Sequence, residues 1–229
     1  RSPSSRRRAV ATLAVGRLDA EGARPLLRYL LQRGSPGEIH AAAIALGEAG
    51  DERDIHALAK AAKRYHWPVP AAAAYALSRL AERGLLRPHA ARALLCELGR
   101  SREPYVRANV AVAMASMAAA PCDADGPNPL TWLGAQHATV VRAAAARWIH
   151  AALAAGHIDA DAASSALVAC AQDDVEAGVR ALCESPMPTA MRERVPTDLY
   201  PHAADGTTPL RNRLLAVRFG SGAVRVSEG

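Results

Sequence analysis

Apolar residues recur every three or four positions along most of the chain, in short segments separated by turn residues. This spacing predicts amphipathic helices. The stretch from Ser35 to Gly84 holds two copies of one pattern, because Ala45-Leu46 and Ala76-Leu77 align at an offset of 31 residues. The same offset places Gly16 and its neighbours on Gly47 and its neighbours. A fixed period of this length is typical of stacked structural repeats.

Turn residues predict where the helices begin and end. Ser35-Pro36-Gly37-Glu38 is a capping box with proline at the first helical position, so a helix is predicted to start there. Gly50 should end this helix and Asp51 should cap the next one. Later helices are expected to open near Pro68, Pro88 and Pro104. Each helix has one apolar face, so it needs a partner beside it to be stable.

The fourth pair of helices departs from the pattern. After its first helix comes a long loop with proline near both ends, from Pro121 to Pro129, and the helix that follows, around Leu130 to Leu133, is predicted to be short. Asp123-Ala-Asp125-Gly126 within this loop is similar to a calcium-binding loop. It lacks the first and the closing ligand of such a loop, so a turn is expected instead.

Three recurring features together resemble the HEAT repeat: a Val-Arg-x-Ala/Asn opening, as at Val106 and Val141, a Gly-Asp turn, and a second helix with paired leucines. The resemblance covers about residues 6 to 185, and repeats of roughly 31 to 37 residues are similar to the short-repeat branch that includes phycobilisome lyase-like proteins. It implies an all-α, right-handed solenoid of about six helical hairpins. Such arrays serve mostly as scaffolds that bind other proteins. The iron-dependent deoxyhypusine hydroxylase branch uses His-Glu pairs, and this sequence has no His-Glu dipeptide.

The last part of the chain has a different character. Residues 186–212 hold several prolines and little periodicity, whereas residues 214–226 alternate apolar and polar positions around Gly220-Ser221-Gly222. This pattern predicts a β-hairpin. We therefore expect two domains, a solenoid over 1–185 and a proline-rich connector with a hairpin over 186–229. The apolar face of the hairpin, which includes Phe219, either caps the last repeat or contacts a partner.

Charge and cysteine content narrow the function only slightly. The formal net charge is +6, and almost all of the basic residues are arginine. This charge is compatible with an acidic partner but does not require one. The four cysteines form no CxxC pair, so neither a zinc site nor a disulfide framework is expected. Cys96, Cys170 and Cys183 are expected as buried helix residues, and Cys122 as an exposed loop residue. The histidines lack metal-ligand spacing, and neither a metal nor a cofactor is predicted.

One cluster suggests a binding site, at the end of a second-type helix that would line the concave face of a HEAT array. It combines cations with rings that could neutralise acidic groups or stack on a partner. Its members are Lys60, Lys63, Arg64, Tyr65, His66 and Trp67. The alternative is that both lysines form a solvated face and Trp67 covers a repeat junction. Asn109, on an apolar face, is expected to bond the backbone of the neighbouring repeat.

No nucleophile–base pair, phosphate loop or carboxylate pair is recognisable, so we expect a protein that is not an enzyme. The predicted function is a scaffold for protein–protein interaction. The alternatives are a nucleic-acid-binding protein, similar to the HEAT-like alkylpurine glycosylases, or a bilin lyase of the repeat class. Those glycosylases use aromatic rings and a carboxylate, whereas Tyr65, Trp67 and Trp132 have no obvious acidic neighbour in this sequence. No apolar run is long enough to span a membrane. The expected location is the cytoplasm, and the periplasm stays open because the sequence starts at Arg1.

Overall fold

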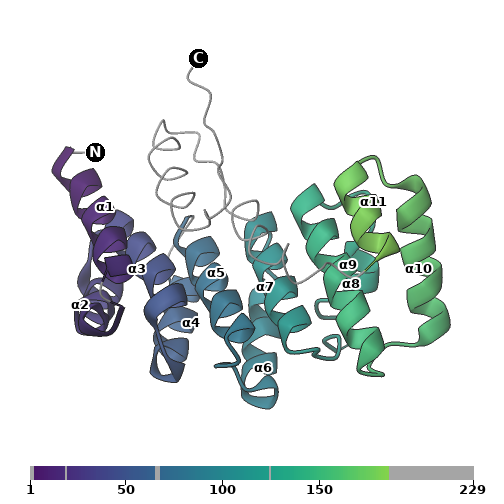
Figure 1. The fold of residues 1–229 in the computed structure, drawn as a ribbon, viewed down its shortest axis with the longest axis horizontal. Helices are drawn as coiled ribbons and strands as arrows, with labels where there is room; N and C mark the ends of the chain where they lie inside the picture. The colour runs from purple at the N-terminus through teal and green to yellow at the C-terminus, as the bar shows by residue number, and fades with distance from the viewer. Residues whose placement is uncertain (1–2, 19, 65–67, 124, 186–229) are drawn as a thin grey trace. The chain divides into compact units, whose positions relative to one another are not determined.

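The structure, a computed structural model, describes residues 3–18, 20–64, 68–123 and 125–185, and these residues form helices joined by turns and loops, without a strand (Figure 1). The predicted hairpin at 214–226 and Phe219 lie outside them. The helices are α1 (Pro3–Leu18), α2 (Ala20–Arg33), α3 (Pro36–Ala49), α4 (Ile55–Arg64), α5 (Val69–Glu82), α6 (Pro88–Gly99), α7 (Pro104–Ser116), α8 (Pro129–Trp132), α9 (Thr139–Ala154), α10 (Ala160–Asp173) and α11 (Ala177–Glu184). A short 3-10 helix, Glu52–Asp54, precedes α4.

The helices stack as repeated pairs. The first helices of successive pairs, α1, α3, α5, α7, α9 and α11, pack on one another in this order (Figure 1). The second helices α2, α4 and α6 each pack on the first helix of the following pair, and α10 packs on both α9 and α11. This arrangement confirms the all-α solenoid that the periodicity predicted. The right-handed sense of the array stays a prediction.

The helix starts follow the predicted capping signals. Glu38 accepts hydrogen bonds from the backbone N–H of Ser35, at 2.9 Å, and from the Ser35 hydroxyl, so the start of α3 is confirmed. Asp159 accepts from the backbone N–H of Ala162 at 2.9 Å and caps α10. The backbone N–H of Gly126 bonds the Asp123 carbonyl at 2.7 Å, which confirms a turn in the Pro121–Pro129 loop.

The predicted apolar stripes form the core. Leu27, Leu46, Leu77, Leu95 and Trp148 are all fully buried. Leu26 and Val175 are apolar residues outside this core, because they are 46% and 84% exposed. Leu26 lies on a different side of α2 from Leu27, and Val175 precedes the first residue of α11 rather than lying within the helix.

The 31-residue period has a steric cause at the contact between first helices. A Cβ atom placed on Gly16 would lie 2.7 Å from the Ala45 Cβ, and one placed on Gly47 would lie 2.8 Å from the Ala76 Cα. Both contacts join residues 29 positions apart, in consecutive repeats. The paired Gly–Ala positions therefore let α1, α3 and α5 approach closely, and any larger residue at either glycine would force the helices apart.

Asn109 meets its prediction only in part. Its Nδ2 donates to the Tyr105 carbonyl in its own helix at 2.8 Å, and lies 3.5 Å from the Ala71 carbonyl in α5 of the neighbouring repeat. The main hydrogen bond is thus within α7, because the side chain can fold back along its own helix to the carbonyl four residues earlier.

The cysteines correct another prediction. Cys96 of α6 forms a disulfide with Cys122 of the following loop, and Cys170 of α10 forms one with Cys183 of α11. The expectation of no disulfide framework was wrong, because it relied on closely spaced cysteines, whereas these partners are 26 and 13 residues apart. Folding brings their Cα atoms to 5.7 and 6.0 Å, a separation that suits a disulfide. Cys122 is also half-buried, not exposed.

Candidate functional site

The predicted basic cluster is only partly within the described residues. Lys60 and Lys63 of α4 are both exposed, and the Lys63 ammonium forms an ion pair with Glu97 of α6. Tyr65, His66 and Trp67, the Arg64 side chain and Phe219 lie outside the described residues. The structure therefore brings Lys63 to a carboxylate of the next repeat, and the cluster as a binding site stays a prediction.

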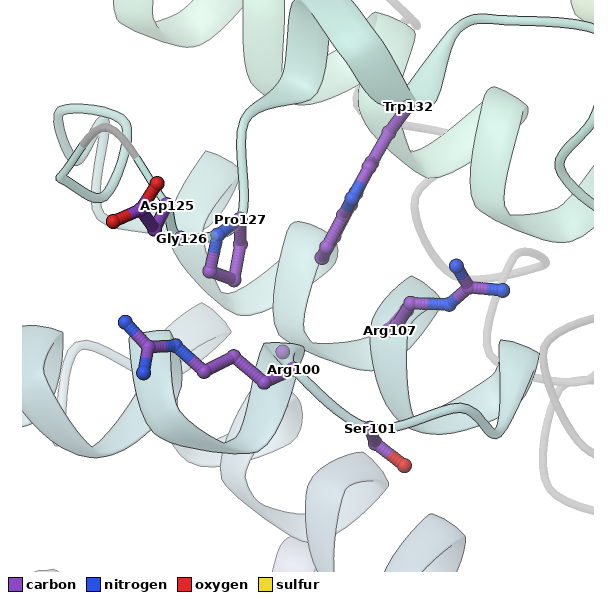
Figure 2. Close-up of a pocket in the computed structure, with 8 residues that line it drawn as sticks. Arg100, Ser101, Arg107, Asp125, Gly126, Pro127 and Trp132 are labelled. Carbon is purple, nitrogen blue, oxygen red and sulfur yellow. The ribbon is translucent and has the colours of Figure 1, made fainter.

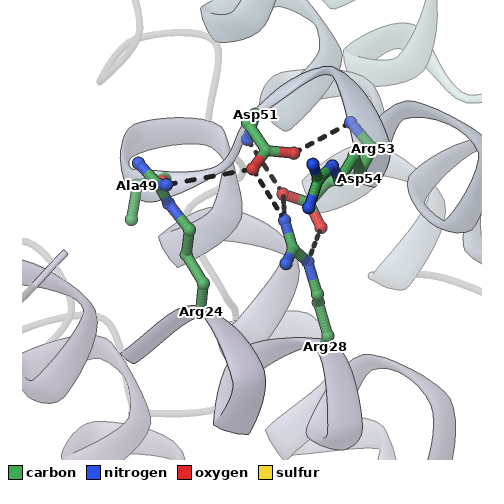
Figure 3. Close-up of polar contacts among 6 residues, drawn as sticks. All are labelled: Arg24, Arg28, Ala49, Asp51, Arg53 and Asp54. Atoms are coloured by element: carbon green, nitrogen blue, oxygen red, sulfur yellow. Dashed lines mark hydrogen bonds and ion pairs between the residues drawn. The ribbon is translucent and has the colours of Figure 1, made fainter. Parts of the chain in front are cut away.

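Arginines of α2 contact the turn between α3 and α4 (Figure 3). The Arg28 guanidinium donates to Asp54 Oδ1 at 2.6 Å and to Asp51 Oδ2 at 2.9 Å. The hydrogen bond to Asp54 is the main cause that raises the pKa of Arg28. Arg24 Nε donates to the Ala49 carbonyl, which closes the end of α3. These arginines hold neighbouring repeats together. Their donors are already bonded to protein oxygens, so they offer little positive charge to a ligand.

A second ion pair is almost completely buried. Arg142 of α9 donates two parallel hydrogen bonds to Asp174, which precedes α11, at 2.6 and 2.9 Å. Both side chains are only 6% exposed. These hydrogen bonds hold the pKa of Asp174 below its usual range. Arg142 Nη1 also donates to the His137 carbonyl at 2.6 Å. The pair is a structural bond between two repeats, and the sequence pattern alone did not indicate it.

A small pocket of about 180 Å³ lies beside the Pro121–Pro129 loop (Figure 2). Arg100, Arg107 and Trp132 line it. Figure 2 shows the guanidinium groups of Arg100 and Arg107 pointing in different directions. Arg107 Nη1 lies 3.2 Å from His137 Nδ1, and the pKa of His137 is lowered by burial and by the charges of Arg107 and Arg142. Because the donors diverge, this pocket is not built to hold one anion.

Trp132 belongs to the core. The residue is 6% exposed, and its ring centroid lies 6.0 Å from that of Trp148, with the ring planes at 68°. This edge-to-face contact is a common stabilising arrangement of aromatic side chains. The ring is therefore packed against α9 and is not presented to a base.

A larger groove, of about 300 Å³, lies between α8 and α10. It exists where α8 has only 4 residues, whereas α2, α4 and α6 have 14, 10 and 12 residues. The apolar side chains along it come from α8, the turn after it and one side of α10. They are Leu130, Leu133, Ala135, Ala166 and Ala169.

The end of the groove is acidic. Asp173 and Asp174 both line it at the C-terminus of α10. Asp174 is already neutralised by Arg142, whereas the Asp173 side chain is exposed. The last carbonyls of α10 add negative partial charge at the same end. The groove thus combines an apolar floor with an acidic end that favours a cation.

Comparison with known proteins identifies the repeats. Residues 1–78, which contain α1 to α4 and most of α5, match the family model for HEAT repeats. Residues 1–78 therefore hold HEAT repeats. The remaining pairs continue the same stacking of first helices through α7, α9 and α11. No curated protein matches the chain.

Within the described residues, every helix is too short or too polar to span a membrane. In the same part of the chain, no group of three or more histidine, cysteine, aspartate or glutamate residues is placed to hold a metal ion.

Part of this site was predictable from the sequence. The short helix around Leu130 to Leu133 was predicted, and α8 confirms it. The groove was missed, because it depends on the distance between α8 and α10, which are separated by the whole of α9. The signal that could have found it is the short second helix itself, since every HEAT pair otherwise supplies a full-length neighbour.

Proposed function

We propose that this chain is a non-catalytic HEAT-repeat scaffold that binds another protein in the groove between α8 and α10. The observation that carries the proposal is the interruption of the second helices at α8, which leaves an apolar groove beside α10. HEAT arrays typically bind other proteins, and a groove between helices is a common place for a partner helix to dock.

The shape and charge of the groove define the partner. A helix fits, because the groove occupies the place where a full-length second helix would pack in the other pairs. Ala166 and Ala169 leave room for close approach, so the contacting face should carry small or aliphatic side chains. A lysine or arginine of the partner would face Asp173 and the negative end of α10. The proposed partner is therefore an amphipathic helix of another protein with a basic residue at one end.

The distribution of cations favours a protein over a nucleic acid. Arg8, Arg28, Arg79 and Arg142 pair with carboxylates of neighbouring repeats, as Lys63 does. Nucleic-acid affinity comes mainly from cations that can neutralise phosphates. Paired arginines inside the array do not supply such a surface, so the +6 formal charge overstates the attraction for phosphates.

Site-specific photocrosslinking in the native host tests the proposal. A photoreactive amino acid replaces Ala162, an exposed residue on the side of α10 that carries Ala166 and Ala169. The matched control replaces Ser164, which is also exposed and lies on the opposite side of the helix, because an α-helix has about 3.6 residues per turn. We expect the Ala162 probe alone to capture one protein, through a peptide with an apolar helical face and a basic end.

Two outcomes would contradict the proposal. Equal capture at Ala162 and Ser164 would show that the groove does not direct binding. Capture of nucleic acid at Ala162, or of peptides without the apolar and basic pattern, would show that the partner has been assigned to the wrong class.

A further inference from the structure

The two disulfides lie on either side of the interruption at α8. Cys96–Cys122 joins the end of α6 to the loop that leads into α8, and Cys170–Cys183 joins α10 to α11. Within the described residues, an Arg92–Asp123 ion pair and hydrogen bonds also hold this loop. The backbone N–H of Cys122 bonds the Pro127 carbonyl at 3.1 Å, and Arg92 donates to the Pro121 carbonyl at 2.6 Å. The disulfide therefore adds a covalent link to a segment that is not itself helical.

The second disulfide holds the last described helix. α11 has 8 residues, and its buried side chains are Val179 and Cys183. A helix this short is marginal alone in water. Cys183 is 3% exposed and Cys170 is 8% exposed, so the bond lies inside the small core formed by α9, α10 and α11.

All four cysteines of the sequence are used in these two bonds. A cysteine that serves only as a small buried hydrophobe needs no partner at bonding distance. Here each cysteine has such a partner, and the two cysteines of each pair lie in different elements of the fold. Structural disulfides persist in oxidising compartments and are rare in the cytosol, where thiols are kept reduced.

We propose that this protein folds and works in an oxidising compartment, where both disulfides form as permanent structural bonds. The oxidant is a disulfide donor, either a thiol–disulfide oxidoreductase or a small-molecule disulfide. One cysteine thiolate attacks the donor disulfide, which forms a mixed disulfide and releases a donor thiolate. The second cysteine thiolate then attacks the mixed disulfide and releases the other donor sulfur. Two electrons pass to the donor, which becomes a dithiol, and the two cysteine protons are transferred to its sulfurs or to water.

An oxidising compartment differs from the expected cytoplasmic location and agrees with the periplasm, the alternative that the sequence left open. This inference does not depend on the proposed function, because the bonds and the compartment can be measured without a partner.

Alkylation of quenched cells tests the inference. Native-host cells are quenched with acid, which stops thiol exchange, and are alkylated with one reagent before reduction and with a heavier reagent after it. Mass spectrometry then reads the label on each of the four cysteines. We expect all four to carry only the second label, and non-reduced digests to contain the peptides of Cys96 and Cys122 joined, and those of Cys170 and Cys183 joined.

First-reagent label on either pair as the main species would overturn the inference, because the bonds would then be absent in living cells. The purified oxidised protein adds a second measurement, its melting temperature with and without dithiothreitol. We expect reduction to lower it by roughly 5–10 °C. An unchanged melting temperature would overturn the structural role of the bonds.

Paired variants separate the two bonds. In Cys96→Ser/Cys122→Ser, dithiothreitol should no longer cause the part of the fall in melting temperature that comes from the loop bond. In Cys170→Ser/Cys183→Ser, it should no longer cause the part that comes from the α11 bond. Each double variant should retain the other part. If one double variant removes the whole effect, the bond that it leaves intact has no structural role.

Discussion

The Asp174→Asn protein is expected to lose about 3 kcal/mol or more of the free energy of unfolding, measured by urea denaturation. Asp174 receives two parallel hydrogen bonds from Arg142, and both side chains are 6% exposed. Asparagine keeps the shape but removes the negative charge, so the Arg142 cation is left buried without compensation. Breaking one side of a buried pair costs much more than the net contribution of the pair.

Glu97→Gln is the matched control for this substitution. It also removes one carboxylate charge from an inter-repeat pair, but Lys63 and Glu97 are 46% and 59% exposed. Water screens such a pair, so the expected loss is below about 1 kcal/mol. A loss at Asp174 no larger than the loss at Glu97 would contradict the role given to the buried pair.

The same pair should appear in the pH dependence of stability. The folded-state pKa of Asp174 is lowered, chiefly by the hydrogen bonds from Arg142. Its contribution to the free energy of unfolding is therefore fully present above the unfolded-state pKa of about 4. It is lost as the pH falls through the lower folded-state value. Asp174→Asn should therefore remove part of the acid destabilisation, and an unchanged acid limb of the stability curve would contradict this assignment.

The Trp148→Ala protein is expected to lose about 3–5 kcal/mol of the free energy of unfolding. Trp148 is completely buried in α9, and its ring packs edge-on against Trp132 of α8. Its Nε1 donates to the Ala119 carbonyl at 2.7 Å, which ties α9 to the segment just after α7 in the preceding repeat. Alanine leaves a large cavity and an unpaired buried carbonyl. Urea denaturation followed by far-UV circular dichroism measures the loss.

Trp148→Phe separates the two contributions. Phenylalanine keeps most of the apolar contact with Trp132 but cannot donate to Ala119, so about 1–3 kcal/mol should be lost. If Trp148→Ala and Trp148→Phe cost the same, the cavity contributes nothing and the packing role of the ring is wrong.

Local signals made much of the fold predictable. The Ser35-Pro36-Gly37-Glu38 box gave the start of α3, and the stripe that contains Leu46 and Leu77 gave the buried faces. These features depend on residues within one or two helical turns. The repeat period extended them to the array, because Gly16 and Gly47 make the same close contact in successive repeats.

Features that depend on distant residues were not predictable. The Arg142–Asp174 pair joins positions 32 apart, and Cys96–Cys122 joins positions 26 apart. Their spacing matches no motif, since the helices and loop between them decide whether the side chains meet. The groove beside α10 arises in the same way, from a helix that is too short to fill the space of a full second helix.

The affinity of the captured partner for groove variants tests the central claim most directly. Ala169 lines the groove, and Ala169→Arg would fill it and repel a basic partner. Ser164→Arg adds the same side chain on the opposite side of α10, where the residue is also exposed. With melting temperatures matched, Ala169→Arg should weaken binding by about tenfold or more, a change of about 1.4 kcal/mol, and Ser164→Arg by less than about twofold. Equal affinities for the two variants would contradict the groove as the binding site.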